Sequence, residues 1–145
     1  MSKVLILTAN GGRAALFTAD SPIAPLAEFE TFDNPAGRAQ DNEFNTDSPS
    51  RTGEGMGTAR HAMTAEVEPQ EHEQIRFAKE LATRLEHERQ SNSFDRLIVC
   101  AAPKFLGMLR ANFNTPLSAL ITVEMDKDYT ALRADELRKR LPEFI

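Results

Sequence analysis

The sequence predicts an α/β domain built on a mixed five-stranded sheet. Three continuous apolar runs of strand length, at 4–9, 97–101 and 117–123, have the pattern of strands that are covered on both faces. Before, between and after the last two runs, apolar residues recur at helical spacing. The predicted order of elements is therefore β-β-β-α-β-α-β-α, with helices packed on the faces of the sheet.

The N-terminal part of the chain predicts three consecutive strands. After the first run, Asn10-Gly11-Gly12 is typical of a tight hairpin turn, and it predicts an antiparallel second strand at 14–19. Residues 26–32 then alternate between apolar and acidic positions, with Phe29 on the apolar face. This alternation predicts a half-exposed strand at the edge of the sheet.

The character of the chain changes from Asp33 to Pro69. Periodicity disappears, and this stretch combines four of the seven glycines with seven acids and three arginines. A connection of this length in a compact domain is usually functional or disordered. The sequence therefore predicts a flexible, acidic, Gly-rich loop at about 33–69, which is disordered or becomes ordered only in a complex.

The second half predicts two βα units that add parallel strands through right-handed crossovers. A helix at 70–88, with Pro69 in its first turn, precedes the strand at 97–101. Its apolar stripe consists of Ile75, Ala78, Leu81, Ala82 and Leu85, with Phe77 beside it. A short helix starts at Pro103, the strand at 117–123 follows, and a last helix begins near Thr130. That last helix carries Ala134, Leu137, Leu141 and Phe144 on one face. A sheet with the first strand at its centre, the ribonuclease-H-like arrangement, is compatible with this pattern.

Length and composition indicate one globular domain spanning residues 1–145. The net charge of −5 opposes contact with bulk nucleic acid and with anionic membranes, so any contact with RNA must be local. The one cysteine, Cys100, lies in an apolar run and is expected to be a buried small hydrophobe. No window resembles a signal peptide or a membrane span, and a cytoplasmic location is expected.

Candidate site residues follow from the topology, because sites of open α/β sheets gather at the carboxyl ends of the parallel strands. Near those ends lie Asn10 with Arg13, Lys104, and Lys127 with Asp128. The two lysines supply positive charge there, and Asp128 is either a site residue or only the cap of the last helix. No nucleophile, metal motif or phosphate loop is recognisable, and neither a cofactor nor a metal is expected.

Two basic groups outside those strand ends have alternative interpretations. Arg60 and His61 lie in the Gly-rich segment, where they can bind a phosphate or carbonyl group or simply pack against the following helix. Arg138, Lys139 and Arg140 form either a basic patch or the last helical turn, where cations interact favourably with the helix dipole. The dipole interpretation is the simpler one.

Several segments together resemble the bacterial family of proteins required for attachment to host cells. They are 4–14 (VLILTANGGRA), 57–63 (GTARHAM), 71–72, 77–78, 94–99 (FDRLIV), 102–107 (APKFLG) and 127–130 (KDYT). The last two are the most specific, and the resemblance covers nearly the whole chain.

That family is similar to the middle domain of archaeo-eukaryotic peptide release factors and of the ribosome-rescue protein Pelota. The resemblance implies a ribonuclease-H-like fold. It also implies a partner, the ribosome or tRNA, that the 33–69 loop would enter. The Gly-Gly-Gln sequence with which release factors reach the peptidyl-transferase centre is absent from this loop. A non-catalytic binding module is therefore expected. The alternatives are a protein-interaction factor, cytoplasmic or at the surface, that affects attachment and, less favoured, a peptidyl-tRNA hydrolase or nuclease.

Overall fold

A five-stranded sheet in the order β3-β2-β1-β4-β5 forms the centre of the molecule. The computed structural model describes the backbone of residues 3–38 and 56–145, with the side chains of 3–38 and 69–145. β1 (Val4–Ala9) pairs antiparallel with β2 (Arg13–Ala19) and parallel with β4 (Arg96–Ala101). β3 (Ala27–Asp33) and β5 (Ile121–Met125) form the two edges. The predicted mixed sheet with a central first strand is confirmed.

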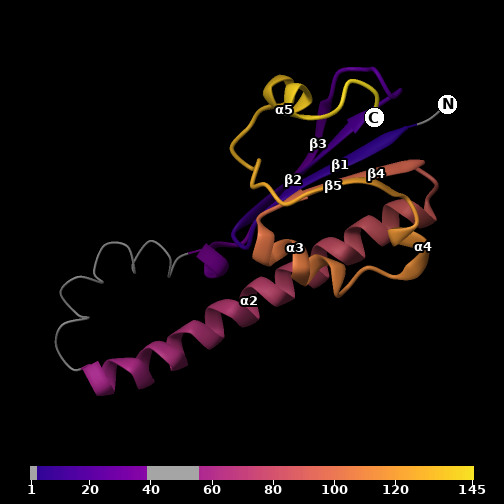
Figure 1. Cartoon of the computed structure of the whole chain (residues 1–145). Coiled ribbons are helices and arrows are strands. Elements are labelled where there is room, and N and C mark those ends of the chain that lie inside the picture. Colours follow the sequence, from indigo (N-terminus) through magenta and orange to yellow (C-terminus); the bar gives the residue numbers. More distant parts are fainter. Residues whose placement is uncertain (1–2, 39–55) are drawn as a thin grey trace.

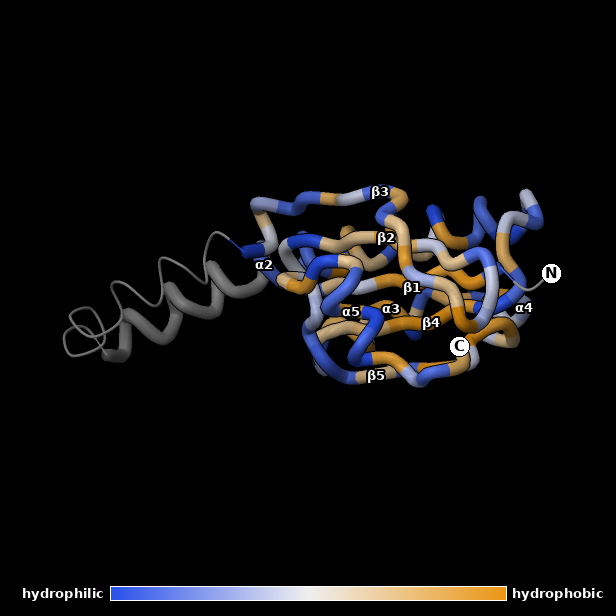
Figure 2. Tube along the Cα trace, turned by 90° about the horizontal axis from the view of Figure 1, so that it is seen from above, coloured by the Kyte–Doolittle hydropathy of each residue, from blue (hydrophilic) through white to orange (hydrophobic). Residues whose placement is uncertain are grey.

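The helices cover both faces of the sheet (Figure 1). α2 (Met56–Gln90), α3 (Pro103–Arg110) and α4 (Thr115–Ser118) lie on one face, and α5 (Ala134–Arg140) lies on the other. Hydrophobic residues concentrate on β1 and β4 in the middle of the sheet, whereas β3 is largely hydrophilic (Figure 2). This distribution follows from position, since only the central strands are covered on both sides.

Alternation along the two central strands divides the core into two clusters. On the α2 face, Leu5 and Leu7 of β1 pack with Leu97 and Val99 of β4. On the α5 face, Ile6 of β1 packs with neighbouring side chains of β4, including Cys100, which is fully buried as predicted. Burial raises the pKa of the Cys100 thiol to about 12. The continuous apolar runs thus supply both faces of one sheet.

Helix α2 differs most from the sequence prediction, because it begins at Met56 rather than at residue 70. Pro69 lies inside the helix and not in its first turn. Residues 56–68 are rich in alanine, methionine and glutamate, which favour a helix. The predicted loop is therefore wrong for 56–69 and also for a short helical turn at 35–38, while its part at 39–55 lies outside the described residues.

The boundaries of the last strand and of the last helix also differ from the prediction. The run predicted as a strand from Leu117 starts with α4, in which Leu117 is buried, and the strand begins only at Ile121. Asn114 caps α4 by accepting a 2.8 Å hydrogen bond from the Leu117 backbone N–H. An apolar run shows burial but does not distinguish a buried helical turn from a strand.

Helix α5 begins at Ala134, later than the predicted Thr130, and ends at Arg140. Leu141 takes the extended conformation that a following proline favours, and Pro142 cannot continue the helix. Phe144 is consequently 62% exposed rather than on a buried helical face.

Strand β3 is half-exposed and lies at the edge, as predicted, but its inward side chain differs from the prediction. The register shifts opposite Leu16 and Phe17 of β2, so the pairing skips Phe29. Phe29 is exposed, and Phe32 packs against the core instead. A bulge of this kind breaks simple alternation, because one extra residue moves the following side chains to the other face.

Candidate functional site

A hollow of about 620 Å³, lined by both polar and apolar groups, lies where β1 and β4 end. Four of the predicted site residues line it: Asn10 after β1, Arg13 at the start of β2, Lys104 from α3, and Asp128 after β5. The other lining residues are Gly11, Gly12, Asp33, Gly37, Arg38, Gln74, Ala102 and Phe105. The carboxyl edge of the parallel strands therefore brings residues distant in sequence to one place, as open α/β sheets do.

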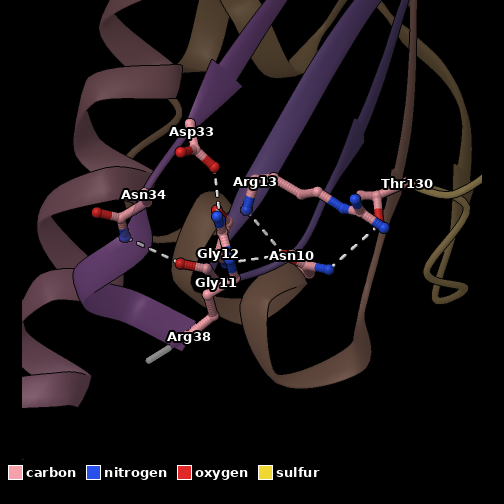
Figure 3. Close-up of polar contacts among 8 residues, drawn as sticks. All are labelled: Asn10, Gly11, Gly12, Arg13, Asp33, Asn34, Arg38 and Thr130. Atoms are coloured by element: carbon pink, nitrogen blue, oxygen red, sulfur yellow. Dashed lines mark hydrogen bonds and ion pairs between the residues drawn. The ribbon is translucent and has the colours of Figure 1, made fainter. Parts of the chain in front are cut away.

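Asn10 organises the turn at the end of β1. Its side-chain Oδ1 accepts hydrogen bonds from the backbone N–H groups of Gly12 (2.7 Å) and Arg13 (2.9 Å). Its Nδ2 donates to Asp128 Oδ2 (2.9 Å) and Thr130 Oγ1 (3.2 Å). The Asn10 amide thus joins the turn to the segment after β5 (Figure 3).

Asp128 is an acceptor for three groups. The Thr130 hydroxyl (2.6 Å) and backbone N–H (3.0 Å) donate to Asp128 Oδ1, while Asn10 donates to the other oxygen. Partial burial raises the pKa of the Asp128 carboxyl, but the hydrogen bonds from Thr130 and Asn10 outweigh it, so the pKa lies below its ordinary value. Asp128 is therefore ionised in the hollow at neutral pH. It does not cap α5, whose N-cap is Arg133.

A lowered pKa of Asp128 predicts a specific loss of stability in acid. The contribution of Asp128 is fully present above the ordinary value of 3.8 and is lost as the pH falls through the lower pKa of the folded state. We expect Asp128→Asn to be less stable than the natural chain at pH 7, with the difference shrinking below about pH 3.8. Urea denaturation across this pH range measures it. Asp20→Asn, at the opposite end of the sheet, is the control, and a difference that does not shrink in acid would contradict the prediction.

The 34–38 turn closes one side of the hollow. Asn34 is 5% exposed, its Nδ2 donates to the carbonyl oxygens of Gly11 (2.9 Å) and Glu73 (3.3 Å), and its backbone N–H donates to Gly12 (2.8 Å). Arg38 Nη1 donates to the Gly12 carbonyl (2.7 Å) and to Asp33 Oδ1 (2.5 Å) (Figure 3). The hydrogen bond from Arg38 lowers the pKa of the Asp33 carboxyl. The turn is thus tied to both the hairpin and α2.

Gly37 lies at the tightest point of this arrangement. Its carbonyl accepts hydrogen bonds from the side chains of Gln70 (3.0 Å) and Gln74 (2.9 Å) of α2. A Cβ at residue 37 would overlap the carbonyl oxygen of Gly11 and the side-chain amide of Asn34. Because the first of these is backbone, the turn itself would have to move.

We expect Gly37→Ala to destabilise the protein by about 1–3 kcal/mol, the usual range for overpacking. Gly107→Ala is the matched control. A Cβ at residue 107 in α3 meets nothing within 4 Å, and alanine should stabilise the helix by about 0.5–1 kcal/mol. Urea denaturation of both variants measures the two effects. A Gly37→Ala variant that is as stable as the natural chain, or more stable, would show that the 34–38 turn adjusts without cost.

Lys104 differs from the other cations of the hollow. It is exposed near the start of α3, and within the described part of the chain it makes neither an ion pair nor a side-chain hydrogen bond. Arg13 is also exposed, and its Nε donates to Thr130 Oγ1 (3.3 Å). Three cationic side chains and two carboxylates line the hollow, although the chain as a whole is acidic.

The remaining predicted site residues are Lys127, Arg60 and His61. Lys127 is exposed and does not line the hollow, although it neighbours Asp128. Arg60 and His61 belong to α2, and their side chains lie outside the described residues, so their role stays a prediction.

Sequence reasoning missed several groups around the hollow. Arg38 lay within the segment interpreted as a loop, although Pro35 and Gly37 around it are turn signals. Gln74 lay on the polar side of a helix, where no signal marked it. Thr130 could have been recognised, because an aspartate two residues before a threonine can bond its backbone N–H.

Metal-ligating groups do not cluster in the described residues. Within 3–38 and 69–145, no group of three or more His, Cys, Asp or Glu side chains is arranged to hold a metal ion. In the same part of the chain, no helix is long and apolar enough to span a membrane.

Fold and site together define an α/β protein with a mixed-charge hollow at the carboxyl edge of its sheet. A family profile described as "protein required for attachment to host cells" matches residues 5–141. The chain therefore belongs to this host-attachment family. No curated protein matches the chain.

Proposed function

We propose that this protein is a non-catalytic, cytoplasmic binding module that associates with the ribosome or with tRNA, using the hollow to contact phosphate groups of RNA. The observation that carries the proposal is Lys104, an exposed cation without an ion pair in the described part of the chain, which lines the same hollow as the exposed Arg13. Two such donors suit a phosphate oxygen. The overall charge of −5 restricts any contact with RNA to this locality.

The strand order supports the same proposal. The order β3-β2-β1-β4-β5, with three antiparallel strands followed by two parallel additions, suits the ribonuclease-H-like arrangement expected for release-factor middle domains. A relationship to those domains is part of the proposal. Such a relationship gives a reason to test translation components first, because fold alone does not determine function.

Co-sedimentation with ribosomes in sucrose gradients tests this function. We expect the natural chain to associate and Lys104→Glu to lose much of the association. The affinity of Lys104→Glu for ribosomes should also fall less steeply with rising salt concentration than that of the natural chain, because about one phosphate contact is removed. Lys79→Glu is the matched control, since Lys79 is an exposed lysine of α2 without an ion pair in the described residues. No association at low and moderate salt would refute the proposal, and equal losses in both variants would exclude the hollow as the site.

A second variant separates the hollow from the adjacent connection. Replacement of residues 40–54, which lie outside the described residues, by a Gly/Ser linker of the same length leaves Asn34, Gly37 and α2 in the chain, and the connection stays long enough for their contacts. Loss of ribosome association in this variant alone would assign the contact to that segment, as the resemblance to release factors implies. Retention would leave the hollow as the contact.

The family description favours a second candidate function, a protein-interaction factor that affects attachment to host cells. Cell fractionation with an affinity-tagged chain distinguishes the two candidates. Recovery at the cell surface, without ribosomes, would favour the second function. Recovery only in the cytosolic ribosome fraction would favour the first.

A further inference from the structure

Asn10 is followed by Gly11, and this pair is chemically labile in peptides. The backbone nitrogen after an asparagine can attack the side-chain amide carbon, and glycine hinders the attack least because it has no Cβ. Gly11 lies in the turn between β1 and β2, and its N–H donates no hydrogen bond within the described part of the chain. The Asn10 side chain lies at the hollow, where water can enter.

We propose that Asn10 is a site of spontaneous deamidation whose rate is set by the hydrogen bonds of its side-chain amide, and that its conversion to a carboxylate abolishes anion binding in the hollow. The second half rests on the proposed function, whereas the first half does not.

The chemical step needs only the chain and water. The Gly11 nitrogen bonds to Asn10 Cγ and gives up its proton, while the bond from Cγ to Nδ2 breaks and that nitrogen leaves as ammonia. Water then opens the cyclic imide. The product carries a carboxylate at residue 10, with the chain continuing through either the main-chain or the former side-chain carbonyl.

The folded structure holds the Asn10 amide at both of its ends. Oδ1 is fixed by the N–H groups of Gly12 and Arg13, and Nδ2 is fixed by Thr130 (Figure 3). Nδ2 also donates to Asp128. Turning the amide carbon toward the Gly11 nitrogen breaks these bonds. Four such bonds should slow deamidation of the folded chain at least about tenfold relative to the unfolded chain.

Conversion would change the charge of the hollow. A carboxylate at residue 10 cannot donate to Asp128 or Thr130, and it would place a second negative charge beside the ionised Asp128. The lining would then have three carboxylates against three cations. The acceptors would compete with a bound anion for Arg13 and Lys104.

Rates of deamidation at Asn10 test the first half of the proposal. The intact chain is incubated at mildly alkaline pH, folded or in urea, and the Asn10 peptide is followed by mass spectrometry. Thr130→Val removes the hydroxyl oxygen that accepts a hydrogen bond from Asn10 Nδ2. The folded variant should therefore deamidate about 2- to 10-fold faster than the folded natural chain. Thr130→Ser keeps the hydroxyl and should restore the natural rate.

Two other asparagines serve as internal controls. Asn34 is followed by Pro35, which has no backbone N–H to attack, so its peptide should stay unmodified. Asn112 lies away from the hollow, so its deamidation rate reports general loosening of the fold. That rate should not rise in Thr130→Val. Equal rates in the folded and unfolded chain, or no effect of Thr130→Val on Asn10, would overturn the proposed control by hydrogen bonding.

Ribosome co-sedimentation of the deamidated form, separated by ion exchange, tests the second half. We expect deamidation to abolish the association that the amide form shows. Undiminished association of the deamidated form would overturn the proposed loss of anion binding. If even the amide form does not associate, the proposed function and the proposed loss of anion binding both fail. The measured deamidation rates still decide whether hydrogen bonding controls the reaction at Asn10.

Discussion

Leu81→Ala should lower the free energy of unfolding by about 2–5 kcal/mol, the usual cost of truncating a buried leucine. Leu81 is 2% exposed and belongs to the cluster between α2 and the sheet. Truncation leaves a cavity that Leu5, Leu97 and their neighbours cannot fill, because the sheet fixes their positions. This cost is a large part of the 5–15 kcal/mol that stabilises a typical domain. Urea denaturation measures it.

Ile75→Ala is the matched control on the same helix. The apolar spacing of α2 places Ile75 on the same stripe as Leu81, but Ile75 is 43% exposed in the structure. Its truncation should cost clearly less, about 1 kcal/mol or below, because the removed atoms are partly in water already. Equal losses in the two variants would contradict the packing of α2 against the sheet.

The comparison of Leu81 with Ile75 illustrates what the sequence could predict about the fold. Apolar spacing identified α2 as amphipathic, and the continuous runs identified β1 and β4, because burial on both faces leaves few polar positions. The spacing could not show how far the stripe stays in contact with the sheet. That extent depends on where α2 meets the sheet, and among the described side chains of α2 burial begins only at Phe77.

The site was predictable where topology alone decided it. Asn10, Lys104 and Asp128 follow strands whose carboxyl ends meet at one edge, so their proximity follows from strand order. Arg38 and Gln74 could not be predicted, because their positions depend on how the 34–38 turn packs on α2. That packing is set by hydrogen bonds to backbone carbonyls, which leave no pattern of residue types in the sequence.

Arg138→Lys should lower the free energy of unfolding by about 2–4 kcal/mol, although it keeps the positive charge. The Arg138 guanidinium donates to four backbone carbonyls: Pro22 (3.2 Å) and Ala24 (3.1 Å) after β2, and Pro142 (2.7 Å) and Glu143 (2.7 Å) after α5. Hydrogen bonds from a charged donor contribute about 1.5–3 kcal/mol each in favourable cases, and exposure of some of these reduces the sum. A lysine ammonium cannot reach four carbonyls in the geometry of the planar guanidinium.

This substitution also tests the helix-dipole interpretation of the basic residues at the end of α5 against the contacts that Arg138 makes. An interaction with the helix dipole depends only on charge, so it predicts little change in Arg138→Lys and a similar loss, about 0.3–1 kcal/mol, in Arg138→Met and Lys139→Met. The observed contacts predict large losses in both Arg138 variants and almost none in Lys139→Met, because Lys139 is exposed. Urea denaturation of the three variants separates these outcomes. If Arg138→Lys is as stable as the natural chain, the contribution of Arg138 is that of a charge at the helix dipole. The apolar contacts of Leu26 and Leu137 would then hold residues 22–24 against α5.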